Sequence, residues 1–118
     1  MAHDALFIGW GEVPAGYRQK ALKVFGEAIE YYNKLKRNGD IESFEPVILD
    51  YHGGDLSGFL IIKGDREKLN RVKMSPDFQA IQARASLVVE RLGVVDAFSG
   101  EGAQARLASF AKHVAELD

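Results

Sequence analysis

The chain has 118 residues, 47% of them hydrophobic and 27% charged, which is the composition of one globular domain with a single core. A formal net charge of -2 lacks the basic excess of nucleic-acid-binding proteins, so we expect no nucleic-acid partner. The chain has no cysteine, which excludes disulfides, thiolate metal sites and a thiol nucleophile.

The first ten residues, MAHDALFIGW, carry no basic segment ahead of their apolar residues. Those apolar residues are also too few for a signal peptide or a membrane span. We therefore expect a cytoplasmic protein with no membrane partner.

The first part of the chain predicts a strand followed by a helix. Residues 5–13 form a short apolar and aromatic run that Pro14 closes, which is typical of a strand. In segment 14–39 apolar residues recur at spacings of three and four, which predicts an amphipathic helix ended by Asn38 and Gly39. The predicted buried stripe of this helix consists of Leu22, Phe25, Ile29, Tyr32 and Leu35.

Two β-rich segments, 41–54 and 55–65, come next and are separated by Gly53 and Gly54, which predicts a hairpin. Segment 66–93 has helical spacing, but a proline cannot lie inside an unbroken helix. We therefore predict a short helix, then a second helix with Ser75 as its N-cap and Pro76 at its first position.

Residues 92–100, LGVVDAFSG, predict a fourth strand, and residues 103–117 predict a C-terminal helix. The element order is that of the split βαβ unit. We predict an α+β, ferredoxin-like βαββαβ domain that spans residues 1–118, with its core unit in residues 5–100. It has a four-stranded antiparallel sheet, helices on one face and an extra C-terminal helix.

If Gly53 and Gly54 form a two-residue turn, paired residues of the hairpin have numbers that sum to 107. One face of the hairpin is then apolar and suited to receive the helices. The other face is apolar in the middle and polar near the turn, and its predicted members are Phe44, Pro46, Ile48, Asp50, His52, Asp55, Ser57, Phe59, Ile61 and Lys63.

An apolar sheet face that no helix covers marks an interface or a ligand site. The same face of a second copy is the simplest cover, which predicts a homodimer through the sheet face. The C-terminal helix is the alternative cover.

The element order, the helix start SPDFQAI at residues 75–81 and the strand LGVVDAFSG resemble the dimeric α/β-barrel superfamily. That superfamily includes antibiotic-biosynthesis-type monooxygenases and stress-responsive barrel proteins. The resemblance covers residues 5–100 and implies a sheet-to-sheet dimeric α/β barrel. No catalytic residue of the superfamily is carried over to this chain.

The polar end of the predicted open face is the candidate site. Asp50 and His52 are the candidate catalytic residues, with His52 as acid or base because its ordinary pKa lies near neutrality. The predicted ligand-binding residues are Asp50, His52, Ser57, Phe59 and Ile48. A metal on Asp50, His52 and Asp55 is chemically feasible, but turns select aspartate and glycine for backbone reasons, so we predict neither a metal nor a cofactor.

Two strand features leave alternatives open. Gly9 and Gly11 leave a gap on one face of the first strand, which fits close packing better than a ligand. Asp96 shares a face with Val94 and Phe98, so it lies either at a sheet edge or in a pocket.

These observations predict a small homodimer that binds a small apolar or aromatic organic molecule. If the protein is an enzyme, the resemblance implies cofactor-free monooxygenase-like or isomerase-like chemistry. The alternative is a non-catalytic ligand-sensing or protein-interaction module.

Overall fold

The computed structural model describes residues 4–118. Its elements in chain order are β1 (Asp4–Trp10), α1 (Arg18–Arg37), β2 (Ser43–Ile48), β3 (Gly58–Gly64), α2 (Arg66–Met74), α3 (Pro76–Ser86), β4 (Gly93–Phe98) and α4 (Gly100–Glu116). The strands form one antiparallel sheet in the order β2-β3-β1-β4. This topology confirms the predicted ferredoxin-like fold. Among the described residues, no helix is both long enough and apolar enough to cross a membrane.

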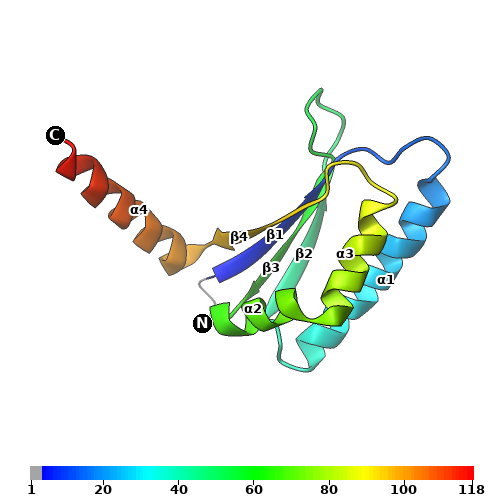
Figure 1. Cartoon of the computed structure of the whole chain (residues 1–118), viewed down its shortest axis with the longest axis horizontal. Coiled ribbons are helices and arrows are strands. Elements are labelled where there is room, and N and C mark those ends of the chain that lie inside the picture. The colour runs from blue at the N-terminus through cyan, green and yellow to red at the C-terminus, as the bar shows by residue number, and fades with distance from the viewer. Residues whose placement is uncertain (1–3) are drawn as a thin grey trace.

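Helices α1, α2 and α3 lie on one side of the sheet, and α4 leaves the end of β4 on the other side (Figure 1). The core lies between the sheet and α1–α3. It is built from alternate residues of the central strands, Leu6 and Ile8 in β1 and Leu60 and Ile62 in β3, which are at most 3% exposed. This alternation is the period-two pattern of a strand with one face buried.

The helices complete the core with residues of helical spacing. In α1 the buried residues are Val24, Ala28, Tyr32 and Leu35, whereas Leu22 is 72% exposed. The predicted α1 stripe is therefore wrong at its N-terminal end, because the buried face is centred on Val24 and Ala28. At its C-terminal end, α1 stops as predicted: Gly39 has a φ of 80° and Asp40 N–H donates to the Leu35 carbonyl at 2.9 Å.

The predicted boundary at Ser75 is confirmed and explains how α2 and α3 meet. Ser75 Oγ donates to the Val72 carbonyl at the end of α2 at 2.8 Å and accepts from Phe78 N–H at 3.2 Å. Pro76 occupies the first turn of α3, where it needs no helical hydrogen bond. One hydroxyl thus closes one helix and starts the next, which seats Leu69, Val72 and Phe78 in the core.

The hairpin differs from the prediction. Strand β2 ends at Ile48 and β3 begins at Gly58, so the connection is a long loop, and of its two glycines only Gly53 has a positive φ. Paired residues sum to 106, as in Val47 opposite Phe59, because the turn is not the two-residue turn assumed. A shift of one residue moves every β2 side chain to the other face. The predicted placement of Phe44, Pro46 and Ile48 on the open face is therefore wrong, and they face the helices.

The sheet face opposite α1–α3, here called the open face, is nevertheless apolar in the middle. The phenyl rings of Phe7 and Phe59 stack there with centroids 5.2 Å apart, and Gly9 leaves room for them because a Cβ at Gly9 would lie 2.7 Å from the Phe7 ring. The close-packing interpretation of Gly9 is confirmed, with an aromatic ring rather than a helix as the packed group. The open face consists of Ala5, Phe7, Gly9, Ser43, Glu45, Val47, Phe59, Ile61, Lys63, Gly93, Val95 and Ala97.

Ser75→Ala should lower the free energy of unfolding by about 1–2 kcal/mol, the usual value of a side-chain N-cap. Urea unfolding measures this. Ser99→Ala is the matched control, since Ser99 stands at the N-cap of α4 without a side-chain capping bond. We expect it to change stability by less than about 0.5 kcal/mol. Equal losses in the two variants would contradict the role given to Ser75.

Candidate functional site

The predicted site residues Asp50, His52 and Ser57 lie in the loop between β2 and β3, which stands beyond the end of the sheet (Figure 1). Asp50 and His52 are exposed. The His52 ring closes this loop: Nε2 donates to the Leu56 carbonyl at 2.9 Å, and Gly54 N–H donates to Nδ1 at 3.2 Å. Both ring nitrogens are therefore used within the loop.

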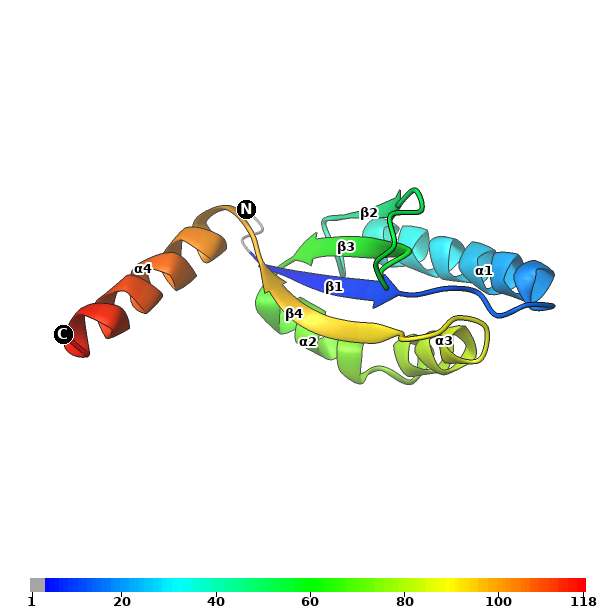
Figure 2. The ribbon, with the colours of Figure 1, turned by 90° about the horizontal axis from the view of Figure 1, so that it is seen from above.

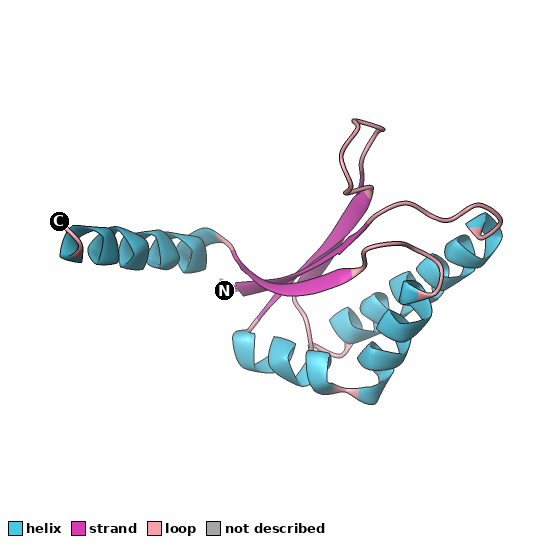
Figure 3. Cartoon of the chain, turned by 45° about the horizontal axis from the view of Figure 1, so that its top comes forward, coloured by secondary structure: helices cyan, strands magenta, loops and turns pink. Residues whose placement is uncertain are grey.

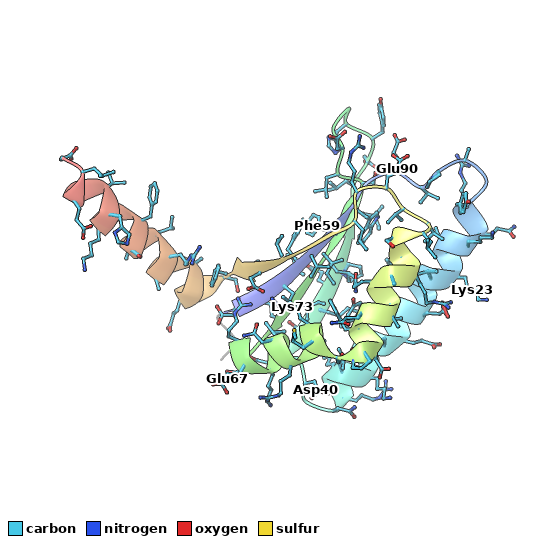
Figure 4. All side chains as sticks on the ribbon, viewed as in Figure 1. Lys23, Asp40, Phe59, Glu67, Lys73 and Glu90 are labelled. Carbon is cyan, nitrogen blue, oxygen red and sulfur yellow. The ribbon has the colours of Figure 1, made fainter. Side chains whose placement is uncertain are left out.

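Ile48 and Phe59, predicted to share a face, lie on opposite faces of the sheet. Ile48 faces the helices and Phe59 the open side, where Figure 4 labels it. The structure thus does not bring the five predicted ligand-binding residues into one pocket. A role of these residues in ligand binding stays a prediction.

Asp50, His52 and Asp55 do not converge on one point. Asp55 forms a long ion pair with Arg91, at 3.6 Å. Within residues 4–118, no three histidine, aspartate or glutamate side chains lie close enough together to hold a metal ion.

A cavity of about 520 Å³ lies on the other side of the sheet, between the strands and helices α1 and α3. Its volume falls in the range of small-molecule sites, about 300–1,000 Å³. Its lining is mostly aliphatic and aromatic and includes Ile8, Trp10 and Leu60 from the sheet, Val24, Phe25 and Ala28 from α1, and Ile81, Ala85 and Val88 from α3.

The cavity exists because the helices pack tightly only at one end. Near α2, large side chains such as Leu35, Leu69 and Phe78 fill the space under the helices. Towards the N-terminus of α1, the lining includes the small side chains Ala21, Ala28 and Ala85 beside larger ones such as Phe25 and Ile81.

Besides the Trp10 indole, the side chains in the lining that carry polar groups are Arg18, Tyr32 and Gln82. Gln82 Nε2 donates to the Tyr32 hydroxyl at 3.0 Å, and Tyr32 is only 1% exposed. Burial is the largest cause that raises the pKa of Tyr32 well above its ordinary value, although the bond from Gln82 acts in the opposite direction. Tyr32 is therefore a neutral phenol at physiological pH, while Arg18 brings a positive charge to the exposed start of α1.

Asp96 lies at the sheet edge rather than in the cavity. Its carboxylate accepts a hydrogen bond from Lys73 Nζ at 2.8 Å and lies 3.1 Å from Arg66 Nη1. The bond from Lys73 is the main cause that lowers the pKa of Asp96. Asp96 thus ties β4 to α2, which carries Lys73 (Figure 4).

The sequence predicted that Phe25 and Tyr32 lie on the apolar face of the first helix, and that a second helix starts at Pro76, but not that these helices line a cavity.

Comparison with known proteins supports the fold. No protein-family model matches the sequence, and no curated protein is significantly similar to it. Solved structures do match. A dabb family protein with a ferredoxin-like fold from Mesorhizobium loti has a TM-score of 0.66 at 14% identity, over 85% of this chain and 99% of that one.

A dimeric protein of unknown function with a ferredoxin-like fold from Bacteroides fragilis has a TM-score of 0.60 at 17% identity, over 80% of this chain and 94% of that one. SnoaB, a cofactor-independent oxygenase from Streptomyces nogalater, has a TM-score of 0.57 at 14% identity, over 84% of this chain and 95% of that one. The chain has a ferredoxin-like fold. At these identities the comparisons show the fold alone.

The raised pKa of Tyr32 predicts how stability depends on alkaline pH. Above about pH 10 the unfolded chain loses the Tyr32 proton and the folded chain keeps it, so stability is full below that pH and falls above it. Tyr32→Phe should remove up to about 1.4 kcal/mol per pH unit from this slope. Urea unfolding between about pH 8 and pH 11 measures it.

The matched control is Tyr51→Phe, because Tyr51 is 91% exposed. We expect it to leave the alkaline slope as in the wild type. A Tyr32→Phe slope equal to that of the wild type would show that the phenol is not held neutral by burial.

Proposed function

We propose that this protein binds a small, largely apolar organic molecule in the cavity between the sheet and helices α1 and α3. The observation that carries the proposal is the cavity itself, about 520 Å³ with a nearly continuous apolar lining. Such a space gains free energy when an apolar molecule replaces water in it, by about 25 cal/mol per Å² of apolar surface buried.

Tyr32 is the orienting group in this proposal. Its oxygen already accepts a hydrogen bond from Gln82, which leaves its own hydrogen for a ligand. A buried O–H without an acceptor favours a ligand that brings one. The proposed ligand is therefore an apolar or aromatic molecule with a carbonyl, ether or similar oxygen near Tyr32.

Chemistry on the bound molecule is a second candidate function. It is supported by the similarity in fold to SnoaB, a cofactor-independent oxygenase. Ligands that co-purify with the protein, identified by native mass spectrometry, provide the substrates to test. If the protein is an enzyme, incubation with such a ligand in air should either increase the mass of the ligand by added oxygen or convert the ligand to an isomer of the same mass. A binding or sensing module returns each ligand unchanged.

The neutral fluorophore N-phenyl-1-naphthylamine is a suitable probe of the cavity. We expect it to bind the wild type with increased fluorescence, and Ala85→Trp to lower its affinity at least about tenfold, because the indole fills the space. Fluorescence titration gives the dissociation constants. Ala83→Trp is the matched control, on the exposed side of the same helix.

Equal affinity of Ala85→Trp and Ala83→Trp would mean that the probe binds elsewhere and would contradict the proposal. The variant His52→Ala belongs in the same titration. It tests separately the sequence-based prediction that the loop between β2 and β3 contributes to binding.

We further propose that the protein is a homodimer formed through the open face. Two matching structures are described as dimeric, each with the same fold. Phe7, Phe59 and Ile61 form an apolar band on this face, and Val95 beside them is 55% exposed. Stacked sheets pack about 10 Å apart, which suits a face whose largest groups are two flat rings.

Light scattering coupled to size exclusion should report about twice the 13.0 kDa chain mass. Phe59→Asp should shift the protein to the monomer, because it places an unpaired charge in the interface. Leu87→Asp, on the helix side and 74% exposed, is the control and should remain a dimer. A wild type that runs as a monomer at high micromolar concentration would refute the dimer.

A further inference from the structure

Helix α4 is an arm that the other described residues, 4–99, leave largely uncovered. None of its 17 residues is buried, and its packing contacts are with β1 and β4. Figures 2 and 3 both show it extending away from the sheet. The radius of gyration is 16.2 Å, whereas a compact domain of this length has about 13.5 Å.

The arm carries an unpartnered apolar stripe. Leu107, Phe110, Val114 and Leu117 are spaced three, four and three apart, the a/d spacing of a helix that packs along a narrow seam. They are 68%, 68%, 45% and 89% exposed. The opposite face carries small and charged residues such as Ala105, Ala108 and Lys112. The helix is therefore patterned for burial of one side.

The base of the arm is attached to the end of β4. Phe98, the last residue of β4, lies between Arg66 and Arg106, whose guanidinium groups are 5.1 Å and 4.4 Å from its ring. These contacts attach only the first turns of the helix. A helix of this length with glycine at position 102 is marginally stable in water by itself. The outer half of the stripe therefore needs a packing partner.

The direction of the arm indicates which partner that is. α4 lies on the open-face side of the sheet, opposite α1–α3 (Figure 1). A partner that binds to the open face would therefore lie within reach of α4. A second copy brings its own open face and its own arm, so a two-fold arrangement covers both faces and both arms at once.

The areas of the open face and of α4 also favour a second copy as the partner. Four strands about 4.8 Å apart and about 20 Å long give the open face a footprint of about 400 Å². A standard interface buries about 800 Å² per partner. The arm, about 25 Å long and 10 Å wide, adds about 250 Å². The sheet alone is a small interface, and the arm brings it towards the standard size.

We infer that α4 packs through Leu107, Phe110, Val114 and Leu117 against a second copy of this chain, so that two copies exchange their C-terminal helices. This inference rests on the proposed homodimer and adds to it. It replaces the sequence-based alternative in which α4 covers the open face of its own chain.

The test compares two double variants that add the same charge to α4. Leu107→Glu with Phe110→Glu should raise the dimer dissociation constant at least about tenfold in analytical ultracentrifugation, because both carboxylates fall on the buried stripe. Ala105→Glu with Ala108→Glu, on the opposite face, should change it less than about threefold. Circular dichroism verifies that both variants keep the fold.

A cross-linking experiment identifies the contact directly. p-Benzoylphenylalanine replaces Leu117, and protein labelled with ¹⁵N is mixed and re-equilibrated with unlabelled protein before irradiation. Cross-linked peptide pairs with mixed isotopes are expected, because they join two different chains. Pairs confined to one chain, or no cross-links from α4, would overturn the inference.

The outcomes separate the arm from the dimer. A monomeric wild type refutes both proposals. A wild-type dimer whose dissociation constant is unchanged by the Leu107 and Phe110 substitutions keeps the sheet interface and refutes the exchange of α4.

Discussion

A four-stranded sheet with two apolar faces and helices on only one of them is the constraint on which this structure depends. The strands pair edge to edge and satisfy their backbone hydrogen bonds, but that pairing buries neither face. On one side, α1, α2 and α3 bury Leu6, Ile62 and their neighbours and form the core. On the other side, Phe7 and Phe59 stack over Gly9 and remain part-exposed. The two functional proposals follow from this imbalance, one from each side of the sheet.

The helix layer itself is asymmetric. Ser75 links α2 to α3 through a single hydroxyl and draws Leu69, Val72 and Phe78 onto the sheet. Further along, Arg84 of α3 pairs with Glu27 of α1 at 2.6 Å on the outer surface, while the inner faces of the same two helices line the cavity. The Ser75 junction and the cavity thus lie at different ends of the helix layer. Substitutions near Ser75 act on the fold, whereas substitutions near Ala85 act on the cavity.

The elements and their order were predictable from the sequence because hydrophobic period and turn residues are local signals. Ser75, Pro76 and Gly39 have the same meaning in any context, and they were interpreted correctly. The register of β2 was not predictable, since it depends on the conformation of the loop that contains Gly53, and a shift of one residue reversed its faces. The predicted candidate site was built on the wrong register, so it placed Ile48 on the open face of the sheet instead of the face that carries the helices. Cavities escape such reasoning altogether, because they arise from volumes summed over elements that are distant in sequence.

The apolar lining of the cavity also determines the state of the water inside it. About 520 Å³ holds on the order of 15 water molecules at liquid density. Of the lining side chains, Arg18, Tyr32, Gln82 and the Trp10 indole carry hydrogen-bonding groups, so most of these waters keep fewer bonds than they have in bulk. Release of such poorly bonded water yields enthalpy as well as entropy. An apolar ligand that enters this space should therefore bind with release of heat near 25 °C and with a negative change in heat capacity.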